Sequence, residues 1–108
     1  MLSFPVFLLS MMVSFQIHDV SATFVTPEGK LLVGIRVIVN VPEGQGVFTT
    51  NEKGVITFRT ASNRVWFSVA GPGGNRVPHP LPDSWKLEGD QPTLHIIIDP
   101  TKIPGATP

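Results

Sequence analysis

The chain has 108 residues, of which 42% are apolar and 15% are charged, so it is long enough for one domain and too apolar for a disordered tail. Its 11 prolines and 10 glycines recur too often for long helices, which excludes a helical bundle. Eight basic and eight acidic residues cancel without any block of like charge, so nucleic acid is not expected as a partner. The chain lacks cysteine, and its stability must therefore come from core packing or from association with other chains.

The first 15 residues, MLSFPVFLLSMMVSF, contain no charged side chain. We interpret residues 1–12 as an apolar N-terminal arm that lies on a neighbouring subunit. Two alternatives stay open: a secretory signal that ends in the small residues 20–22, and a true translation start at Met11 or Met12. A membrane-spanning helix is not expected, because this run is shorter than the roughly 20 residues needed to cross a bilayer.

The strands expected after the arm are short, alternate between apolar and polar residues, and are separated by turn residues. The turn signal at residues 26–30, TPEGK, combines Pro with Gly and predicts a hairpin between the strands on either side of it. The run at residues 83–87 fits either a single turn or a short edge strand. The other expected strands are residues 20–25, 35–41, 47–50, 55–60, 64–70 and 93–99.

The alternation slips by one residue at His18 and Asp19. The apolar residues of 13–17 keep one phase, whereas those of 20–24 keep the opposite one. A slip of this kind would turn the apolar face to water, so a β-bulge or a strand break is expected there. The segment before His18 can therefore leave its own sheet and pair elsewhere.

Two proline-rich segments are expected to lack regular structure. Residues 71–82, GPGGNRVPHPLP, predict a long irregular loop, and residues 100–108 predict a C-terminal tail. The strand at residues 64–70 is apolar on both sides, so a second layer or a subunit contact should cover it. The chain thus divides into an arm at residues 1–12, a sandwich at residues 13–99 and the tail.

Short strands with frequent turn signals predict an all-β, antiparallel β-sandwich of about seven strands. Residues 20–60 contain, in order, a strand, a turn with Gly, a strand introduced by Gly34, a Thr-rich strand, an Asn-x-x-Gly turn at residues 51–54 and a further apolar strand. This order resembles carboxypeptidase regulatory-like and bacterial Ig-like domains. The resemblance implies an Ig-like or transthyretin-like sandwich of the kind that serves as a spacer or attachment module in surface proteins and phage particles.

An enzymatic family with a similar sandwich is that of the transthyretin-like hydroxyisourate hydrolases. His18-Asp19, followed by Pro27-Glu28-Gly29, stands here in a loosely similar order. That family's C-terminal Tyr-Arg-Gly-Ser signature has no counterpart in a chain without tyrosine. The resemblance to this family therefore does not extend to its activity.

The sequence contains no arrangement typical of catalysis or metal binding. No His-x-His or His-x-x-x-His spacing joins any two of the three histidines, and no Gly-x-Ser-x-Gly elbow is present. Gly71-Pro72-Gly73-Gly74 is not followed by the Lys and Ser or Thr of a phosphate-binding loop. We therefore expect a protein that is not an enzyme and that needs neither cofactor nor metal, although a small hydrolase that uses His18 stays open as a minor hypothesis.

These observations favour a non-enzymatic structural module that docks on other protein subunits, as a homo-oligomer or within a larger assembly. The resemblance favours a component of a bacteriophage or virus particle, such as a head decoration, connector or tail-associated protein, and hence a virion location. The alternative is a secreted or cell-surface adhesion domain that binds protein or carbohydrate, with Trp66 and Trp85 as an aromatic platform for sugar rings. The candidate partner-binding residues, in the arm and at exposed apolar or loop positions, are Phe4, Val6, Phe7, Leu8, Leu9, Trp66, His79 and Trp85.

Overall fold

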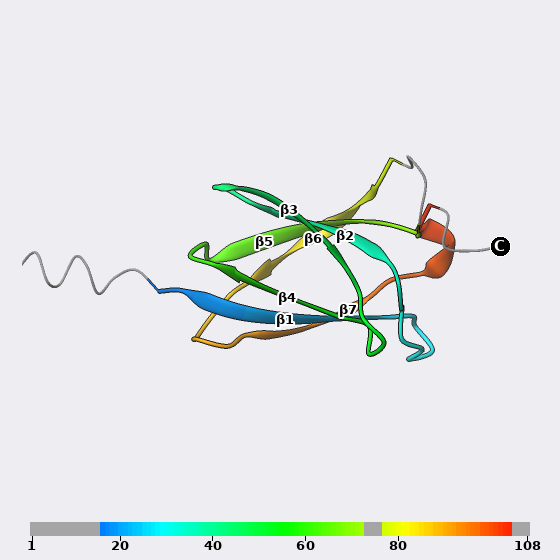
Figure 1. Ribbon diagram of the computed structural model, residues 1–108, viewed down its shortest axis with the longest axis horizontal. Helices are drawn as coiled ribbons and strands as arrows, with labels where there is room; N and C mark the ends of the chain where they lie inside the picture. Colours follow the sequence, from blue (N-terminus) through cyan, green and yellow to red (C-terminus); the bar gives the residue numbers. More distant parts are fainter. Residues whose placement is uncertain (1–15, 73–76, 105–108) are drawn as a thin grey trace, which may run out of the picture.

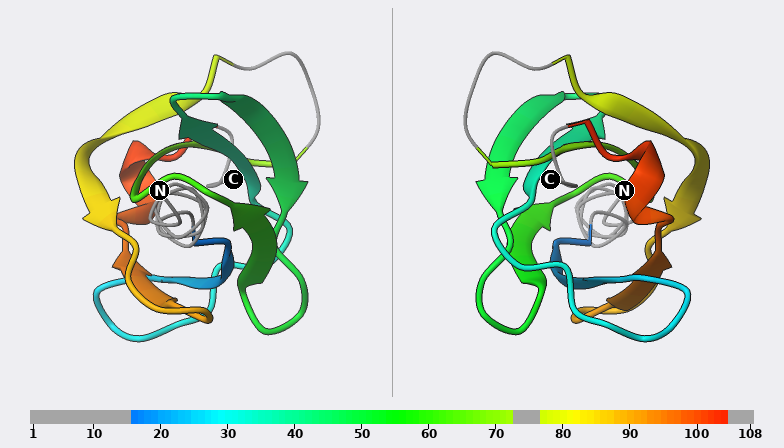
Figure 2. Two further views of the ribbon diagram at one scale, coloured as in Figure 1. Left: turned by 90° about the vertical axis from the view of Figure 1, so that its left-hand side faces the viewer. Right: turned by 90° about the vertical axis from the view of Figure 1, so that its right-hand side faces the viewer.

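The computed structural model describes residues 16–72 and 77–104, which form two β-sheets packed face to face (Figures 1 and 2). The predicted all-β sandwich is confirmed. A single turn of 3-10 helix, η1 (Pro100–Lys102), follows the last strand. The strands of the described residues are β1 (His18–Val25), β2 (Arg36–Val41), β3 (Gly44–Thr49), β4 (Val55–Thr60), β5 (Arg64–Ala70), β6 (His79–Lys86) and β7 (Thr93–Ile97).

These strands form a three-stranded sheet in the order β4-β1-β7 and a four-stranded sheet in the order β3-β2-β5-β6. Neighbouring strands run antiparallel, as expected, except for β1 and β7, which are parallel. This pair is parallel because the chain reaches β7 from β6 in the opposite sheet and not through a hairpin from β1. The end-on views of Figure 2 show the two layers, with β1 (blue) and β7 (orange) in one and β6 (yellow) in the other.

The tight turn predicted at residues 26–30 forms, with a short hairpin around it in which the Thr26 N–H donates to the Lys30 carbonyl and the Leu32 N–H donates to the Phe24 carbonyl. The hairpin does not extend into a pairing of β1 with β2, because these two strands lie in opposite sheets. The Gly29 N–H donates to the Thr26 carbonyl at 2.8 Å, and Gly29 has a φ of 87°, which favours glycine. Leu31 then makes a single bridge to Val25, after which the chain crosses to the other sheet and begins β2. Each of these strands has one apolar face, and placing them in opposite sheets turns the two faces toward each other.

Alternate side chains of both sheets point into one core, as the period-two pattern predicts. Phe24 of β1 and Phe67 of β5 meet edge to face with ring centroids 5.5 Å apart, and Phe58 of β4 lies 6.1 Å from Phe67. These rings join the two sheets at their centre. Aliphatic residues buried around them include Val20, Ala22, Val37, Val39, Val65, Val69, Leu94 and Ile96.

The C-terminal tail expected at residues 100–108 is in part folded. After η1 the side chain of Ile103 enters the core with 2% of its surface exposed. The Pro104 carbonyl accepts a hydrogen bond from the Gly71 N–H at 2.6 Å. The tail prediction is therefore wrong for its first half, because one buried isoleucine stabilises that half against the sandwich in spite of the flanking prolines. Its second half lies outside the described residues.

The irregular loop expected at residues 71–82 is shorter than predicted, because β6 begins at His79. The register between β5 and β6 shifts where Trp66 pairs with Ser84 and Ser68 pairs with Pro80, so the residues between these pairs bulge out of the ladder. β6 is an edge strand, and a proline there leaves no ladder bond unmade. Residues 83–87 were expected to form either a single turn or a short edge strand, and the edge strand is the correct alternative for residues 83–86.

β1 begins at His18, where the alternation was expected to slip. Its pairing with β4 runs without a bulge from His18 to Thr23, and His18 is buried in phase with Val20. The slip therefore coincides with the first residue of the strand and not with a bulge inside it. Residues 13–15, which the predicted sandwich included, and the arm at residues 1–12 lie outside the described residues.

Candidate functional site

The three histidines stand on three different strands. His18 pairs with Thr60 of β4, whereas His95 of β7 pairs with Thr23, five residues further along β1. At about 3.3 Å per residue these two positions are roughly 17 Å apart. His79 begins β6 in the other sheet. Within residues 16–72 and 77–104, no cluster of His, Asp and Glu side chains could hold a metal ion, and no helix is long and apolar enough to span a membrane.

His18 is a core residue, with 1% of its surface exposed. Its Nδ1–H donates to the carbonyl of Gly89 in the loop between β6 and β7, since a carbonyl oxygen can only accept. Its Nε2 has no hydrogen-bond partner among the described residues. The ring therefore ties the start of β1 to this loop, and its burial keeps it away from any substrate in solvent.

The two tryptophans lie on opposite faces of the four-stranded sheet. Trp66 faces outward next to Ser84 of β6 and has 40% of its surface exposed. Trp85 faces inward, and its ring centroid lies 5.2 Å from that of Phe67. The two rings therefore do not form the predicted aromatic platform, because consecutive positions on paired strands alternate between the faces of a sheet.

A groove of about 510 Å³ runs between β6 and β7 along one open side of the sandwich, and we call it the β6–β7 groove. It brings together His79 and Trp85, two of the predicted partner-binding residues. Its apolar side chains come from both sheets. The remaining lining residues are Pro80, Leu81, Pro82, Asp83, Ile96, Ile97, Ile98, Asp99 and Lys102.

The end of the β6–β7 groove next to η1 carries charged groups. The Asp99 carboxylate caps η1 by accepting from the Thr101 N–H at 3.0 Å and from the Thr101 hydroxyl at 2.9 Å. These two bonds, followed by the positive charge of Lys102, hold the pKa of Asp99 below its ordinary value. Asp99 is therefore already engaged within the chain, and the free surface of the groove is largely apolar.

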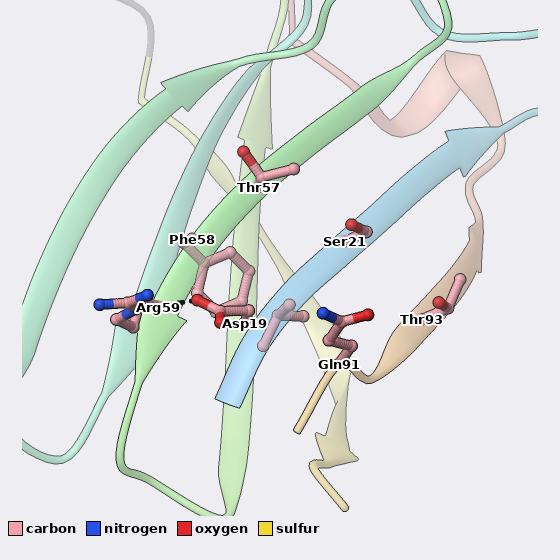
Figure 3. A pocket seen from close by; sticks show the side chains of 8 residues that line it. Asp19, Ser21, Thr57, Phe58, Arg59, Gln91 and Thr93 are labelled. Atoms are coloured by element: carbon pink, nitrogen blue, oxygen red, sulfur yellow. Dashed lines mark hydrogen bonds and ion pairs between the residues drawn. The ribbon is translucent and has the colours of Figure 1, made fainter. Parts of the chain in front are cut away.

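The outer face of the three-stranded sheet carries hydrogen-bonding groups, and we call it the polar face (Figure 3). The hydroxyls of Thr57, Ser21 and Thr93 form a row across β4, β1 and β7, because Ser21 pairs with both threonines. A shallow depression of about 480 Å³ contains this row together with Gln91. Such an array of hydroxyl and amide groups suits a polar ligand or ordinary hydration.

An ion pair borders the polar face, and Figure 3 shows its two side chains next to each other. The Arg59 Nε–H donates to Asp19 Oδ1 at 2.8 Å. This hydrogen bond, with the attraction between the two charges, raises the pKa of Arg59. Both side chains are more than half exposed, so solvent screens the pair and it adds little to stability.

The outer face of the four-stranded sheet is apolar at its centre. Ile38 of β2 pairs with Val47 of β3 and with Ser68 of β5, and Ser68 pairs in turn with Pro80 of β6. Trp66 stands on the same face, two residues along β5 from Ser68. Val47 and Trp66 have 65% and 40% of their surfaces exposed. We call Ile38, Val47, Trp66 and Pro80 the apolar stripe.

The other open side of the sandwich, between β3 and β4, is bridged by Glu43 in the turn after β2. Its carboxylate accepts from the Ser62 hydroxyl and from the Thr60 hydroxyl, the latter at 3.4 Å. The Ser62 bond above all keeps the pKa of Glu43 below its ordinary value of 4.5. Phe48 and Phe58 lie beneath with centroids 6.0 Å apart. Side chains of the domain itself therefore link the two sheets on this side.

The structure brings together only some of the predicted partner-binding residues. His79 and Trp85 share the β6–β7 groove, whereas Trp66 lies on the outer face of the sheet. The sequence analysis missed Leu81 as a groove residue because it assigned this position to a loop. The one feature of the sequence that could have indicated the groove is the apolar Ile97, which stands on the outward side of its strand. The predicted arm residues, which lie outside the described residues, are Phe4, Val6, Phe7, Leu8 and Leu9.

No family model matches the chain, and no curated protein matches it. Among solved structures, the chain is similar to the TIE protein of Bacillus anthracis, with a TM-score of 0.53 and 14% sequence identity. The match covers 78% of this chain but only 17% of that chain, so this chain spans a small part of the protein it matches. At this identity the similarity shows a shared β-sandwich fold and nothing about activity.

Proposed function

We propose that the protein is a non-enzymatic assembly module that docks on other protein subunits through the apolar stripe. The stripe is the observation that carries this proposal. It places an exposed tryptophan and an exposed valine on the outer face of the four-stranded sheet, between the polar residues that end the strands. Exposed apolar patches with a polar rim are typical of protein-binding sites, and tryptophan is enriched among the residues that contribute most to binding.

The polar residues around the apolar stripe fit the rim of a protein interface. Asn40 and Gln45 bond to each other at 2.7 Å next to Trp66, and Arg64 donates to Ser84 at 2.8 Å on the other side. Hydrogen bonds within the domain leave these groups only partly free, so they add specificity at the rim without a large desolvation penalty. The centre of the interface would then consist of the four stripe residues.

We infer from the sequence resemblance that the assembly in which this protein docks is a phage or virus particle. Ig-like and transthyretin-like modules occur in surface proteins and in phage particles, and of these two settings we propose the particle, with the domain as a head decoration, connector or tail-associated protein. The confirmed β-sandwich is compatible with that family and supports it to this extent. In such a particle the partner of the stripe is another structural protein, and the location is the virion.

Site-specific photo-crosslinking tests the docking surface. A photoreactive phenylalanine analogue is placed at position 66 on the stripe and, as a matched control, at Thr57 on the polar face. We expect a discrete crosslinked protein from position 66 in the native assembly and none from position 57. Equal crosslinking at both positions, or none at position 66, would contradict the proposal.

The captured partner then allows a binding measurement. We expect Trp66→Ser to weaken binding by about tenfold or more, which corresponds to about 1.4 kcal/mol, and Thr57→Ser to leave the affinity unchanged. A thermal unfolding curve of each variant serves as the folding control. An unchanged Kd for Trp66→Ser would show that the stripe is not the docking surface.

The alternative, a secreted or cell-surface adhesion domain, is favoured by the polar face with its row of hydroxyl groups. It is less well supported for carbohydrate, because the exposed tryptophan and these hydroxyls lie on opposite faces of the molecule, whereas sugar sites combine aromatic and hydrogen-bonding groups. Cleavage after residues 20–22 would also remove the first five residues of β1. An adhesion domain would therefore need a different processing site.

A further inference from the structure

β7 has an unpaired edge next to the β6–β7 groove. In its parallel ladder with β1, the Ile98 N–H donates to the Val25 carbonyl and the Pro92 carbonyl accepts from Ser21. Backbone groups alternate in direction along a strand, so the N–H and C=O groups of His95 and Ile97 point to the free edge. No backbone partner for these groups occurs within the described residues. An unpaired edge of this kind is a template for a further strand.

The other three edge strands are protected by means that β7 lacks. β6 contains Pro80 and Pro82, which have no N–H to donate to a strand added at its free edge. β3 contains Gly44 and Gly46 and is therefore weak as a template, and Glu43 bridges the side where β3 and β4 lie. β7 contains neither proline nor glycine, and its Ile97 is 62% exposed. Among the described strands β7 is the one best suited to accept a partner.

The groove supplies an apolar surface for the side chains of such a strand. Leu81 and Trp85 from β6 are half-buried and pack against the core. On the opposite wall Ile96 and Ile98 are buried, and Ile97 is exposed. A strand added beside β7 would point every second side chain into this space. The occupant should therefore be an extended, uncharged segment that alternates between apolar and small polar residues.

The chain itself contains a segment with this pattern immediately before Gln16. Val13 and Phe15 alternate with Ser14, and none of the first 15 residues is charged. At about 3.3 Å per residue these 15 residues can extend for about 50 Å, several times the length of β7. This reach allows the segment to span the free edge of a neighbouring molecule.

The position of Gln16 favours binding of the N-terminal segment to a second copy and not to the groove of its own molecule. Gln16 donates through Nε2 to Asp90 Oδ1 at 3.0 Å, so the segment leaves the domain at the end where β7 begins. To reach its own β7 it would have to reverse direction within a few residues. Of the residues that favour such a reversal, residues 6–17 contain Ser10 and Ser14 but no Gly, Pro, Asn or Asp. A segment that continued in the direction of β1 would lead away from its own sandwich.

We propose that the N-terminal segment of one copy pairs with the free edge of β7 in a second copy and places alternate apolar side chains in the β6–β7 groove. This strand exchange extends the three-stranded sheet to four strands and closes the open side of the sandwich. It goes beyond the proposed function, because it uses the free edge of β7 and a second copy of this chain, whereas docking uses the outer face of the four-stranded sheet around Trp66. Reciprocal exchange gives a closed dimer, and one-way exchange gives a chain of copies.

Cysteine trapping between separate chains tests this pairing, because the natural chain contains no cysteine. Ser14→Cys is made in one full-length protein and His95→Cys in another that carries a different tag, and the two proteins are mixed and oxidised. In the proposed pairing both cysteines would lie on the outward side of the extended sheet. A matched control replaces His95→Cys by Thr57→Cys on the other edge strand. We expect a disulfide-linked pair that carries both tags from Ser14→Cys with His95→Cys, several-fold above the control.

Two further outcomes decide against the proposal. A chain with both cysteines that forms only an internal disulfide would show that the segment covers its own groove. Linkage no higher than with Thr57→Cys would show that β7 does not accept it. Light scattering gives a second measurement: the full-length protein should have at least twice the mass of the 11.7 kDa chain, and a protein that starts at Gln16 should be a monomer. A monomeric full-length protein overturns the inference.

The readouts keep this inference separate from the proposed docking function. Trp66→Ser should leave both the disulfide and the oligomeric mass unchanged, since Trp66 does not line the β6–β7 groove. Removal of residues 2–15 should abolish the oligomer and leave the photo-crosslink from position 66. If Trp66→Ser abolished the oligomer, the copies would associate through the stripe and the strand-exchange inference would be wrong.

Discussion

The two sheets of this sandwich have similar inner faces and very different outer faces. Inside, both sheets contribute alternate aliphatic and aromatic residues to a single core. Outside, the three-stranded sheet carries hydroxyls and an ion pair, with Ile97 as an exposed apolar residue at its β7 edge, whereas the four-stranded sheet carries the apolar stripe. Core packing constrains an inner face to be apolar, but nothing in folding requires an outer face to be so. This difference is the reason why we propose the outer face of the four-stranded sheet as the docking surface.

The largest expected effect concerns the three-stranded sheet, whose central strand is β1. A protein that starts at Thr23 loses His18, Val20 and Ala22 from the core and their pairing with β4 and β7. Val20 alone is worth about 2 kcal/mol, and the total loss is comparable with the roughly 5–15 kcal/mol that holds a domain together. We expect no cooperative unfolding transition by circular dichroism.

The matched control starts at Gln16 and keeps the whole of β1. It should unfold cooperatively, with a Tm close to that of the full-length protein measured at low concentration. If the protein that starts at Thr23 folded equally well, the three-stranded sheet would not depend on β1 as its central strand. The contrast between the sheets would then have a different basis.

Neighbouring residues of β5 compare the inner and outer faces of the four-stranded sheet directly. Phe67→Ala removes a ring that contacts Phe24, Phe58 and Trp85, and it should lower the free energy of unfolding by about 4 kcal/mol. Trp66→Ala should lower it by about 1 kcal/mol, because the ring is partly exposed. Urea unfolding measures both values. Equal losses would mean that Trp66 serves folding and not docking.

The smallest effect concerns the bridge between the sheets at Glu43. Its folded-state pKa lies below the ordinary value, so its contribution to stability is fully present above the ordinary value of 4.5 and is lost as the pH falls through the folded pKa. Ser62→Ala removes the main cause and should move the Glu43 midpoint upward in an NMR titration of its carboxyl carbon. Asp99 is the internal control, since its pKa is lowered by Thr101 and should not change.

An unchanged Glu43 midpoint in Ser62→Ala would show that the Ser62 hydroxyl does not lower its pKa. The side between β3 and β4 would then be less firmly bridged than the structure indicates. The β4 edge would then lack this protection, although the prolines of β6 and the glycines of β3 would still protect the other two edges.

Local features of the sequence predicted most of the strands correctly. The expected strands at residues 55–60 and 64–70 coincide with β4 and β5, and the inward positions of β7 are the alternate residues Leu94 and Ile96. Alternation and turn residues act over a few neighbours, so a sequence displays them directly. The candidate site was only partly predictable, because His79 and Trp85 meet in a groove whose other wall comes from a strand in the opposite sheet.

By itself, the sequence determined the fold class, the approximate strands and the apolar segment before Gln16, since these follow from composition and period. Only the tertiary structure decided which strands pair: it separates β1 from β2, joins β1 to β7 in parallel, and buries Ile103 beyond the last strand. It also decided that Trp66 faces outward and Trp85 inward. These outcomes depend on which apolar faces can be buried against each other at once, and that balance involves residues far apart in the chain.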